Sequence, residues 1–578
     1  MKIKSLLIGM LACSAMVACT NTDEPEVDNG SAKGNEYYVA VSLAMPGNAS
    51  SRALGNKTFE DGTPQEVAVK KAAFYFLNAN NQGCADACVL TEAQLANLNP
   101  WTDLTDQNVD TKSSPVIVMK NATEIPSKIV AILNTDVTSF GNRPSLSTLQ
   151  TKIDTYTTTT YNAFNQTNGM VMSSTAYKDN NGDLVIGAPV SITNIYQDRD
   201  ELTNALNQGD KATADMIPVV IPVEKVLAKV HVEEADQMTT ENLNGYQVED
   251  ADQDASNNTV NFTVNITGWW LDSTPTNSYL IKNMDFTGVT GSWWNDVANK
   301  RSYWAKSSST ANYFNYAYNV WAENEEDLYC QENTLNNALE TEDNDNVNNE
   351  NQRTKVVVAA TLMNGENAVS LVKWFGQYYT EAGFKATVAN LSDVKQYYKK
   401  TSAEGETEAY ESLGVNDLTI VYNTDATTDT EASTSTQTDV KIDNEEIRNY
   451  EAAVEISYTG DIYTYENGVA TKVTNKEAVN NAIRKITRMQ FWNGGNTYYY
   501  VDLEHCSATE DANAQYGIVR NHLYNLTLNG IKGLGTPVPN PNKVIIPEKP
   551  GDSDMETYIS AQIEILSYRV VSQGVVLQ

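Results

Sequence analysis

A short segment near the start of the chain alternates between two kinds of side chain at every second residue. One side of the segment consists of Tyr37, Val39, Val41, Leu43 and Met45, and the residues between them are mostly small. A period of two is the pattern of a β-strand with one buried face. The segment therefore predicts one isolated strand whose apolar side must pack against some other part of a β-structure.

The residues that follow this strand predict an exposed loop that a protease can cut. Residues 46–53 are mostly small and polar, and Arg52 is the first arginine of the chain, the next being Arg143. Exposed loops of this kind are preferred sites of proteolysis. A cut between Arg52 and Ala53 would detach one strand and nothing else. The alternative is an ordinary first strand followed by a chance arginine.

A second apolar strand is predicted at the opposite end of the chain, between residues 558 and 571. One side of it consists of Ile559, Ala561, Ile563 and Ile565, and after a change of register near Leu566 the alternation continues with Tyr568 and Val570. A strand to lose and a strand to donate together predict a subunit that polymerises by exchanging strands.

Five prolines precede this last strand, although the whole chain has only 16. They lie between Pro537 and Pro550. Because proline removes a backbone donor and favours extended conformations, we expect a stalk that holds the last strand away from the body of the protein.

The first residues predict an exported lipoprotein. Lys2 and Lys4 precede an apolar run of about a dozen residues, which is too short for a stable membrane anchor. The run ends in small residues before Cys19, as in a lipobox, so Cys19 is predicted to carry the lipid, palmitate included. Cys13 is a poorer candidate because its apolar run would be too short, and a simple secretory signal is the alternative.

Composition indicates a β-rich secreted protein and argues against nucleic-acid binding. The chain has 578 residues, enough for two or three domains, and its net charge of −34 would repel a phosphate backbone. Its 31 tyrosines and recurrent Asn-Gly pairs are typical of strands and hairpin turns. The fold is therefore predicted to be mainly β. One helix is predicted over Pro144–Ile153, where Leu146, Leu149 and Ile153 have helical spacing and Ser145 stands near the start as a cap.

The cysteines and histidines do not predict a metal site. Outside the leader the cysteines are Cys84, Cys88, Cys330 and Cys506. Outside the cytoplasm they could pair, but four cysteines allow three pairings and the sequence does not choose among them. Their spacing does not match a zinc site, and the chain has only three histidines to assist.

Other candidate sites are weak, and no catalytic motif stands out, so we expect neither an enzyme nor a cofactor. Asp250, Asp252 and Asp254 resemble the start of a calcium loop, but Ala255 and Asn261 occupy the positions that should be Gly and Glu, and Asp343–Asp345 fares no better. His505–Cys506 is expected to be structural. The pairs Trp269–Trp270 and Trp293–Trp294 could stack on sugars, although such residues are more often core.

Several segments resemble a known family, the major fimbrial subunits or fimbrillins of type V pili of Bacteroidales, on the short-fimbria branch. The segments that carry the resemblance are Tyr329–Thr334, Thr497–Val501, Tyr516–Tyr524, Gly533–Gly535 and Ser567–Gln573. Two departures are Tyr568, where tryptophan is expected, and the acidic insertion around Asp343.

The resemblance implies two transthyretin-like β-sandwich domains and a C-terminal donor strand. The implied parts are a signal peptide (1–18), a lipidated propeptide with the removable strand (19–52), an N-terminal sandwich (53–222), a C-terminal sandwich (223–536), and the stalk with the donor strand (537–578).

The resemblance also implies a life cycle. The precursor is an outer-membrane lipoprotein, an extracellular arginine-specific protease cuts after Arg52, and the donor strand of another copy fills the groove that is left. The implied partners are further copies in a surface fimbrium and accessory tip and anchor subunits, with adhesion receptors left open. The rival hypothesis is a monomeric surface lipoprotein whose β-sandwich binds glycans or proteins.

Overall fold

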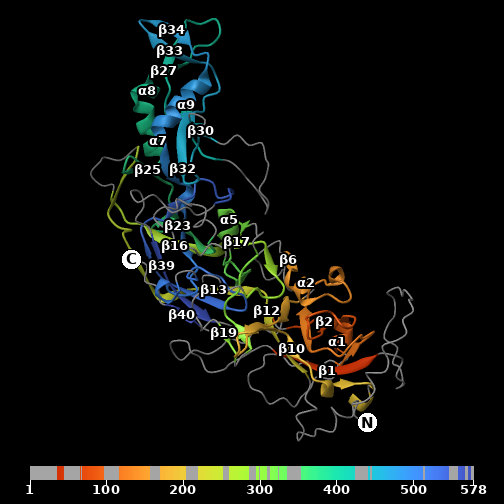
Figure 1. Ribbon diagram of the computed structural model, residues 1–578. Helices are drawn as coiled ribbons and strands as arrows, with labels where there is room; N and C mark the ends of the chain where they lie inside the picture. The colour runs from red at the N-terminus through yellow and green to blue at the C-terminus, as the bar shows by residue number, and fades with distance from the viewer. Residues whose placement is uncertain are drawn as a thin grey trace.

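The computed structural model shows an elongated molecule in which three groups of sheets follow one another along its length (Figure 1). It describes residues 36–44, 66, 68–96, 116–155, 169–198, 200–202, 219–251, 259–284, 295–297, 300–308, 313–322, 324–334, 353–423, 440–442, 445–511, 514–545, 558–566 and 571–573. Strands make up most of the secondary structure, which confirms the prediction of a mainly β chain. The division into two transthyretin-like sandwiches stays a prediction.

The N-terminal unit, residues 36–225, is built on a nine-stranded sheet. In order across the sheet the strands are β11 (Ile195–Tyr196), β1 (Tyr37–Ala44), β12 (Val219–Lys225), β7 (Met172–Ser174), β5 (Lys128–Leu133), β2 (Lys71–Leu77) and β3 (Cys88–Thr91), with β4 (Val116–Met119) beside β1 and β10 (Ala188–Pro189) beside β5. Alternate side chains of β2 and β5 enter two separate apolar clusters, so both faces of this sheet are covered.

One short helix of this unit begins as the sequence predicts and ends sooner. The hydroxyl of Ser145 accepts a hydrogen bond from the backbone N–H of Thr148 and caps α2 (Leu146–Gln150). Leu146 and Leu149 are buried as expected. The expected continuation to Ile153 is wrong, because Ile153 begins β6 (Ile153–Thr155), which pairs with β18 (Asn277–Tyr279).

The central unit consists of two sheets that enclose one apolar core. The first contains β22 (Leu328–Cys330), β13 (Ala228–Glu241), β37 (Leu523–Lys532), β39 (Tyr558–Leu566) and β40 (Val571–Gln573), and the second contains β16 (Thr263–Asp272), β23 (Lys355–Asn364), β36 (Asn496–Asp502), β38 (Thr536–Pro537) and β24 (Asn367–Ala368). Residues of both sheets meet in the same buried cluster. Trp269 and Trp270 belong to it, so the idea that they stack on sugars is wrong.

A distal unit stands beyond the central one. Its seven-stranded sheet contains β15 (Thr259–Val260), β14 (Tyr246–Glu249), β26 (Gln377–Tyr379), β25 (Leu371–Trp374), β35 (Met489–Trp492), β32 (Glu451–Ile456) and β29 (Leu418–Val421), and a smaller sheet contains β28 (Tyr410–Ser412), β27 (Tyr397–Lys400), β33 (Ile462–Glu466) and β34 (Val469–Lys472). Helices α7 (Glu381–Asn390) and α9 (Lys476–Thr487) pack on its own apolar core. The segment predicted as one C-terminal domain therefore holds two separate cores.

Short elements complete the described structure. The two-stranded pairs are β8 (Ala176–Lys178) with β9 (Leu184–Ile186), β17 (Thr274–Pro275) with β21 (Tyr313–Phe314), β19 (Asn295–Asp296) with β20 (Arg301–Ser302), and β30 (Lys441–Ile442) with β31 (Glu445–Glu446). The remaining short helices are α1 (Glu92–Ala96), α5 (Tyr318–Trp321), α8 (Ser392–Lys395), α10 (Ala508–Asp511), and the 3₁₀ turns η1 (Thr138–Phe140), η2 (Ile192–Asn194), η5 (Val415–Asp417) and η6 (Asn493–Gly495).

Two buried ion pairs lie close together, and one of them, Lys282–Glu224, joins the N-terminal unit to the residues that follow it. The guanidinium of Arg520 makes two hydrogen bonds to the carboxylate of Glu332, at 2.7 and 2.6 Å, and a third to the carbonyl of Leu280. Nearby, Lys282 Nζ lies 2.8 Å from a carboxylate oxygen of Glu224 in β12. Because a buried charge must be paired, the Lys282–Glu224 pair fixes β12 of the N-terminal unit against the residues that follow it.

β12 runs across the boundary predicted at residues 222 and 223. It pairs with β1 through Pro222 and continues to Lys225 because Val223 enters the same core and pairs with Ser174 of β7. The first strand of the central sheet begins only at Ala228.

The proline-rich stretch does not stand away from the body over the part that the structure describes, so that expectation is wrong. Pro537 pairs with Thr497 of β36, and Val538 and Ile545 are buried in the central core. The side-chain amide of Asn540 donates to the carbonyl of Asn423, at 2.9 Å. Apolar side chains between the prolines hold residues 536–545 against the protein.

Candidate functional site

β1, the first described strand of the chain, is held inside a sheet rather than laid on its surface. Its first half pairs on one edge with β4, Tyr38 opposite Val118, and on the other with β11, Tyr38 opposite Tyr196. Its second half runs parallel to β12, with Val41 opposite Val219. Interior strands satisfy most of their backbone hydrogen bonds through their neighbours, so removing β1 would open strand edges along a groove.

The side chains that the alternation selects are the buried ones. Val39 and Val41 are fully buried, Leu43 is 2% exposed, and all three pack in the apolar core of the N-terminal unit. Tyr37 is half-buried against the same core. Met45 lies outside the described residues. The predicted strand and its inward face are thus present, while its removal stays a prediction.

Every strand that pairs with β1 lies after Arg52 in the sequence. The partners β4, β11 and β12 begin at residues 116, 195 and 219. A cut after Arg52 would therefore leave β1 attached by non-covalent contacts alone. Arg52, Ala53 and Cys19 lie outside the described residues, so the cleavage site and the lipid site stay predictions.

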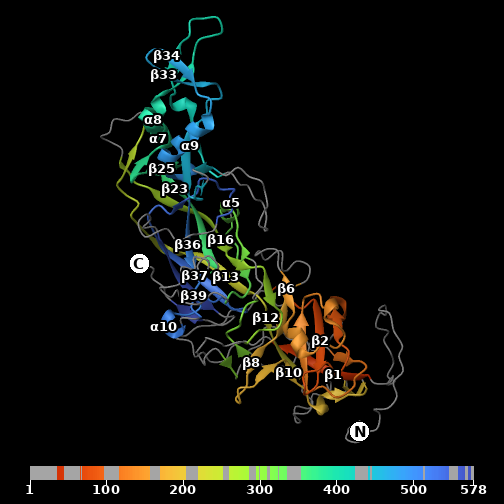
Figure 2. The same ribbon diagram turned by 45° about the horizontal axis from the view of Figure 1, so that its top comes forward.

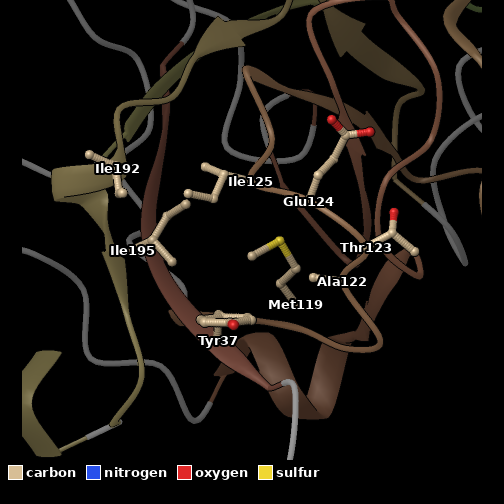
Figure 3. A pocket seen from close by; sticks show the side chains of 8 residues that line it. All are labelled: Tyr37, Met119, Ala122, Thr123, Glu124, Ile125, Ile192 and Ile195. Atoms are coloured by element: carbon tan, nitrogen blue, oxygen red, sulfur yellow. The ribbon is translucent and has the colours of Figure 1, made fainter. Parts of the chain in front are cut away.

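A small hollow opens at the beginning of β1 (Figure 3). Tyr37 of β1 forms one wall of it, and the other lining residues are Met119, Ala122, Thr123, Glu124, Ile125, Ile192 and Ile195. Most of this lining is apolar, and the carboxylate of Glu124 is held by the side-chain amide of Asn78, at 2.6 Å. Tyr37 is therefore the residue through which β1 borders the hollow.

The predicted donor strand is present as β39, and it lies on its own body. β39 runs antiparallel to β37, with Ile563 opposite Leu526 and Ile559 opposite Ile531. Its other edge pairs with β40, which belongs to the same tail. The predicted donor residues Ile559, Ala561, Ile563 and Ile565 all lie in β39, whereas Tyr568 and Val570 lie outside the described residues. The sequence did not indicate this pairing within one chain.

Glu66 ties the residues after the cleavage loop to the contact between the units. Its carboxylate is fully buried and lies 3.4 Å from Lys229 Nζ and 3.9 Å from Lys225 Nζ. The hydroxyl of Tyr329 also donates to it. Lys225 belongs to β12, the strand beside β1, so Glu66 would keep the remaining chain fixed after a cut at Arg52. Nothing in the sequence pattern distinguished this glutamate.

The other candidate sites have structural surroundings. His505 and His522 are buried, and burial lowers the pKa of both, that of His505 to about 3. His505 Nδ1 lies 2.8 Å from the hydroxyl of Tyr524, and the thiol of Cys506 donates to the carbonyl of Asp511. These contacts account for the His505–Cys506 pair without chemistry.

The cysteines and the candidate metal ligands can be located only in the described part of the chain. Cys84, Cys88, Cys330 and Cys506 are free thiols, and burial raises the pKa of each of the first three. Within the ranges given above, no group of three or more His, Cys, Asp or Glu side chains could hold a metal ion. Asp250 accepts a hydrogen bond from Thr380, and the rest of its loop lies outside these ranges. No helix among the described residues is long and apolar enough to cross a membrane.

Comparison with known proteins finds a family match at the C-terminal end. Residues 490–573 match the model of the C-terminal part of fimbrillin, the major fimbrial subunit protein type IV. This segment begins in β35 and ends with β40, so it includes β36, β37 and β39. A search of curated proteins gives no match.

The solved structures that match this chain are distant. One is a protein of Parabacteroides distasonis to which a cell-adhesion role has been assigned, with 11% identity, 93% of this chain and 98% of that chain covered, and a TM-score of 0.38. Another is the tip fimbrial protein Mfa3 of Porphyromonas gingivalis, with 9% identity, coverage of 91% and 99%, and a TM-score of 0.28. TM-scores this low do not establish a shared fold. The family match over residues 490–573 is the stronger similarity.

Proposed function

We propose that this chain is a structural subunit of a cell-surface fimbrium that polymerises by strand exchange after proteolytic removal of β1. The fimbrillin match over residues 490–573 supports the fimbrial part of the proposal. The position of β1 supports the exchange mechanism, and it is the observation that carries the proposal: an interior strand whose pairing partners all follow Arg52.

The free energy gained by burying the side chains of β1 explains why cleavage alone would not empty the groove. Val39, Val41 and Leu43 are buried almost completely, and burying such side chains stabilises by about 1.5–3 kcal/mol each. Their loss, together with the opened strand edges, makes the vacant groove unfavourable. A strand from another copy that supplies both apolar side chains and backbone pairing would restore these contacts.

The donor strand must leave its own body before it can enter another. β39 pairs with the body only through β37, since its second partner β40 is part of the tail. Transfer to the groove of the next copy would exchange one set of backbone pairs for another of the same kind. The resulting contact joins different surfaces of successive copies, and contacts of this type extend into fibres when the rotation between copies does not close a ring.

The remaining parts of the proposal come from the leader. Export as an outer-membrane lipoprotein through Cys19 would deliver the precursor to the surface with β1 still in place. An arginine-specific extracellular protease would then cut at Arg52, and tip and anchor subunits would complete the fimbrium. While β1 fills the groove, polymerisation inside the cell is prevented.

Trypsin treatment of the purified precursor tests this function. We expect a product that begins at Ala53 and forms filaments that resist dissociation in SDS. Arg52→Lys should still be cut by trypsin and polymerise, whereas Arg52→Ala treated with an arginine-specific protease, which spares Lys57, should stay uncut at this position and monomeric. Deletion of residues 557–578 should give a cleaved chain that accepts a donor strand but forms no filaments of its own.

Two outcomes would contradict the proposal. One is a cleanly cleaved wild-type chain that remains monomeric after loss of the β1 peptide, which would favour the rival monomeric binding protein. The other is filament formation by the deletion variant, which would show that β39 is not the donor.

A further inference from the structure

The small sheet at the far end of the distal unit carries a row of tyrosines. Its strands, in the order β28, β27, β33 and β34, lie at the end of the molecule away from the N-terminal unit, as both ribbon views show (Figures 1 and 2). Tyrosine occurs twice in β33 and at the beginning of both β27 and β28.

Strand register places four of these tyrosines on one face. Tyr398 of β27 lies opposite Tyr463 of β33, and residues directly opposite in antiparallel strands share a face. Tyr465 is two residues further along β33, on the same side. Tyr410 lies opposite Lys400, which is two residues from Tyr398. We call Tyr398, Tyr410, Tyr463 and Tyr465 the tyrosine face.

The rings of the tyrosine face form a connected, ridged surface. The ring centroids of Tyr410 and Tyr463 are 5.0 Å apart, those of Tyr398 and Tyr465 are 5.5 Å apart, and those of Tyr410 and Tyr465 are 5.9 Å apart. The rings are tilted against one another by 41° to 69°. Tyr465 is 43% exposed and the other three are partly exposed, so ring surface remains open to a ligand.

The charged groups around this face are paired with one another. Lys400 Nζ lies 2.8 Å from a carboxylate oxygen of Glu408, which also accepts a hydrogen bond from the hydroxyl of Tyr410. Lys472, opposite Tyr463 in the register, lies 2.7 Å from Asp461. The face thus offers polar groups for hydrogen bonding with no unpaired ion at these two positions, within a chain whose net charge is −34.

The net charge of the chain and the area of the tyrosine face together indicate which kind of ligand fits. An anionic partner would be repelled by the net charge of the chain and would find both lysines of the face already paired. A stable protein partner needs about 800 Å² on each side. Four strands of three to five residues span on the order of 250 Å², given the usual strand and residue spacings. An uncharged ligand a few rings long matches this area.

We infer that the tyrosine face binds an uncharged glycan through stacking of sugar rings on Tyr398, Tyr410, Tyr463 and Tyr465. Pyranose rings present flat arrays of C–H groups that pack on aromatic rings, and their hydroxyls hydrogen-bond to groups such as Glu408 and the tyrosine hydroxyls. Tyrosine supplies a rigid ring and a polar group at low cost in side-chain entropy. The face lies away from β1 and β39, so strand exchange would leave it accessible.

The test is an array of neutral hexose oligosaccharides, with sialylated and sulfated glycans as the anionic arm, probed with the full chain as a monomer. We expect binding to at least one neutral glycan. The double variant Tyr410→Ala/Tyr465→Ala should bind it at least about tenfold more weakly, since stacking on an aromatic ring changes affinity by roughly this factor. Tyr410→Phe/Tyr465→Phe should keep most of the affinity because it keeps the rings.

Phe375→Ala is the matched control. Phe375 is 88% exposed on a different hairpin of the distal unit, so its removal deletes an aromatic surface residue outside the tyrosine face and should leave binding unchanged. Thermal unfolding of each variant separates a lost ligand contact from a lost fold. Because the assay uses the monomer, its result does not depend on whether the chain polymerises.

Three results would overturn the inference. The first is no binding to any neutral glycan on the array. The second is binding to anionic glycans alone that disappears at high salt, which would indicate a charge-driven contact. The third is neutral-glycan binding that does not depend on the two rings. In that case the folded Tyr410→Ala/Tyr465→Ala variant would keep full affinity, or the Phe variant would lose as much affinity as the Ala variant.

Discussion

β1 and β39 are both apolar strands near an end of the chain, but the protein holds them differently. The first half of β1 is paired on both edges, and its inward side chains are buried in the core of the N-terminal unit. β39 pairs with the body along one edge, through β37, and its other edge meets its own tail. One strand fills a sheet from within, while the other extends a sheet from its side.

This difference indicates which strand needs help to leave. Extraction of β1 opens strand edges and an apolar core at once, so a cut in the loop after it is necessary but insufficient. Release of β39 would break its backbone pairing with one edge of β37 and its contacts with β36 in the facing sheet. A chain with these two strands can keep its acceptor groove closed until cleavage while its donor strand is comparatively easy to release.

Locking β1 in place should have the largest effect. Tyr38 of β1 lies opposite Val118 of β4, so Tyr38→Cys/Val118→Cys places two thiols across the antiparallel pair. Once oxidised, this variant should be cut by trypsin and yet form no filaments, because the strand cannot leave. Reduction should restore polymerisation, which electron microscopy would show in the same sample. Filaments from the oxidised protein would mean that β1 need not be removed.

Locking β39 to β37 should prevent a copy from donating this strand while its own groove can still accept a strand from another copy. Thr527 of β37 lies opposite Gln562 of β39, so Thr527→Cys/Gln562→Cys provides the matching lock at the other strand. Added to cleaved wild-type chains, the oxidised variant should join one filament end and stop its growth, so mean filament length falls as its proportion rises. Normal filaments of the oxidised variant alone would contradict the requirement that β39 leave its own body.

Trimming one apolar side chain from each strand should sharpen the contrast. Leu43→Ala removes a buried side chain from β1 and should lower the free energy of unfolding of the N-terminal unit by about 2–5 kcal/mol. Ile563→Ala in β39 should leave the stability of that unit unchanged and weaken the filament instead. Chemical denaturation of the uncut precursor and heat dissociation of filaments measure the two effects. Equal destabilisation of the N-terminal unit by both would refute the distinction.

Acid should act on the unit that holds β39. The three histidines of the chain all lie beyond β12, and burial lowers the pKa of His505 and His522 below the ordinary value of 6.5. Below that value the unfolded chain takes up protons that the folded chain does not, so stability falls as pH falls, by up to about 1.4 kcal/mol per pH unit for each histidine.

A variant isolates this acid effect. His231 works in the opposite direction, because its hydrogen bond to Asp327 raises its pKa and favours the folded state at low pH. Denaturation curves of wild type and His505→Gln between about pH 6 and pH 4 should therefore differ in slope by close to one proton. Identical slopes would show that His505 is protonated in the folded protein. The N-terminal unit, without histidine, should show no such difference.

Local patterns in the sequence predicted several elements correctly because each of these elements depends mainly on the residues of one segment. Alternation identified β1 and its inward residues Val39, Val41 and Leu43, and the hydroxyl of Ser145 marked the beginning of α2. The same reasoning failed for the proline-rich stretch, where Val538 and Ile545 reach the core between the prolines. For Trp269 and Trp270 the more common outcome, burial in a core, is confirmed, although their burial depends on distant strands.

The tyrosine face and Glu66 show why other features escaped prediction. The four tyrosines lie in three strands separated in the sequence by up to 67 positions, from Tyr398 to Tyr465, and only strand register brings their rings together. Glu66 meets Lys225, Lys229 and Tyr329, none of which is near it along the chain. Contacts of this kind depend on topology, which no local pattern encodes.

By itself the sequence determined that two apolar segments, one before Arg52 and one after Pro550, are strands in need of a sheet, and it predicted a cleavage site at Arg52. Only the tertiary structure decided which edges meet those strands: an interior position among β4, β11 and β12 for β1, and the side of β37 for β39. The physical reason is that a strand's alternation specifies the face it must bury. The backbone donors and acceptors of a strand can pair with any open strand edge, whether that edge belongs to the same chain or to another copy.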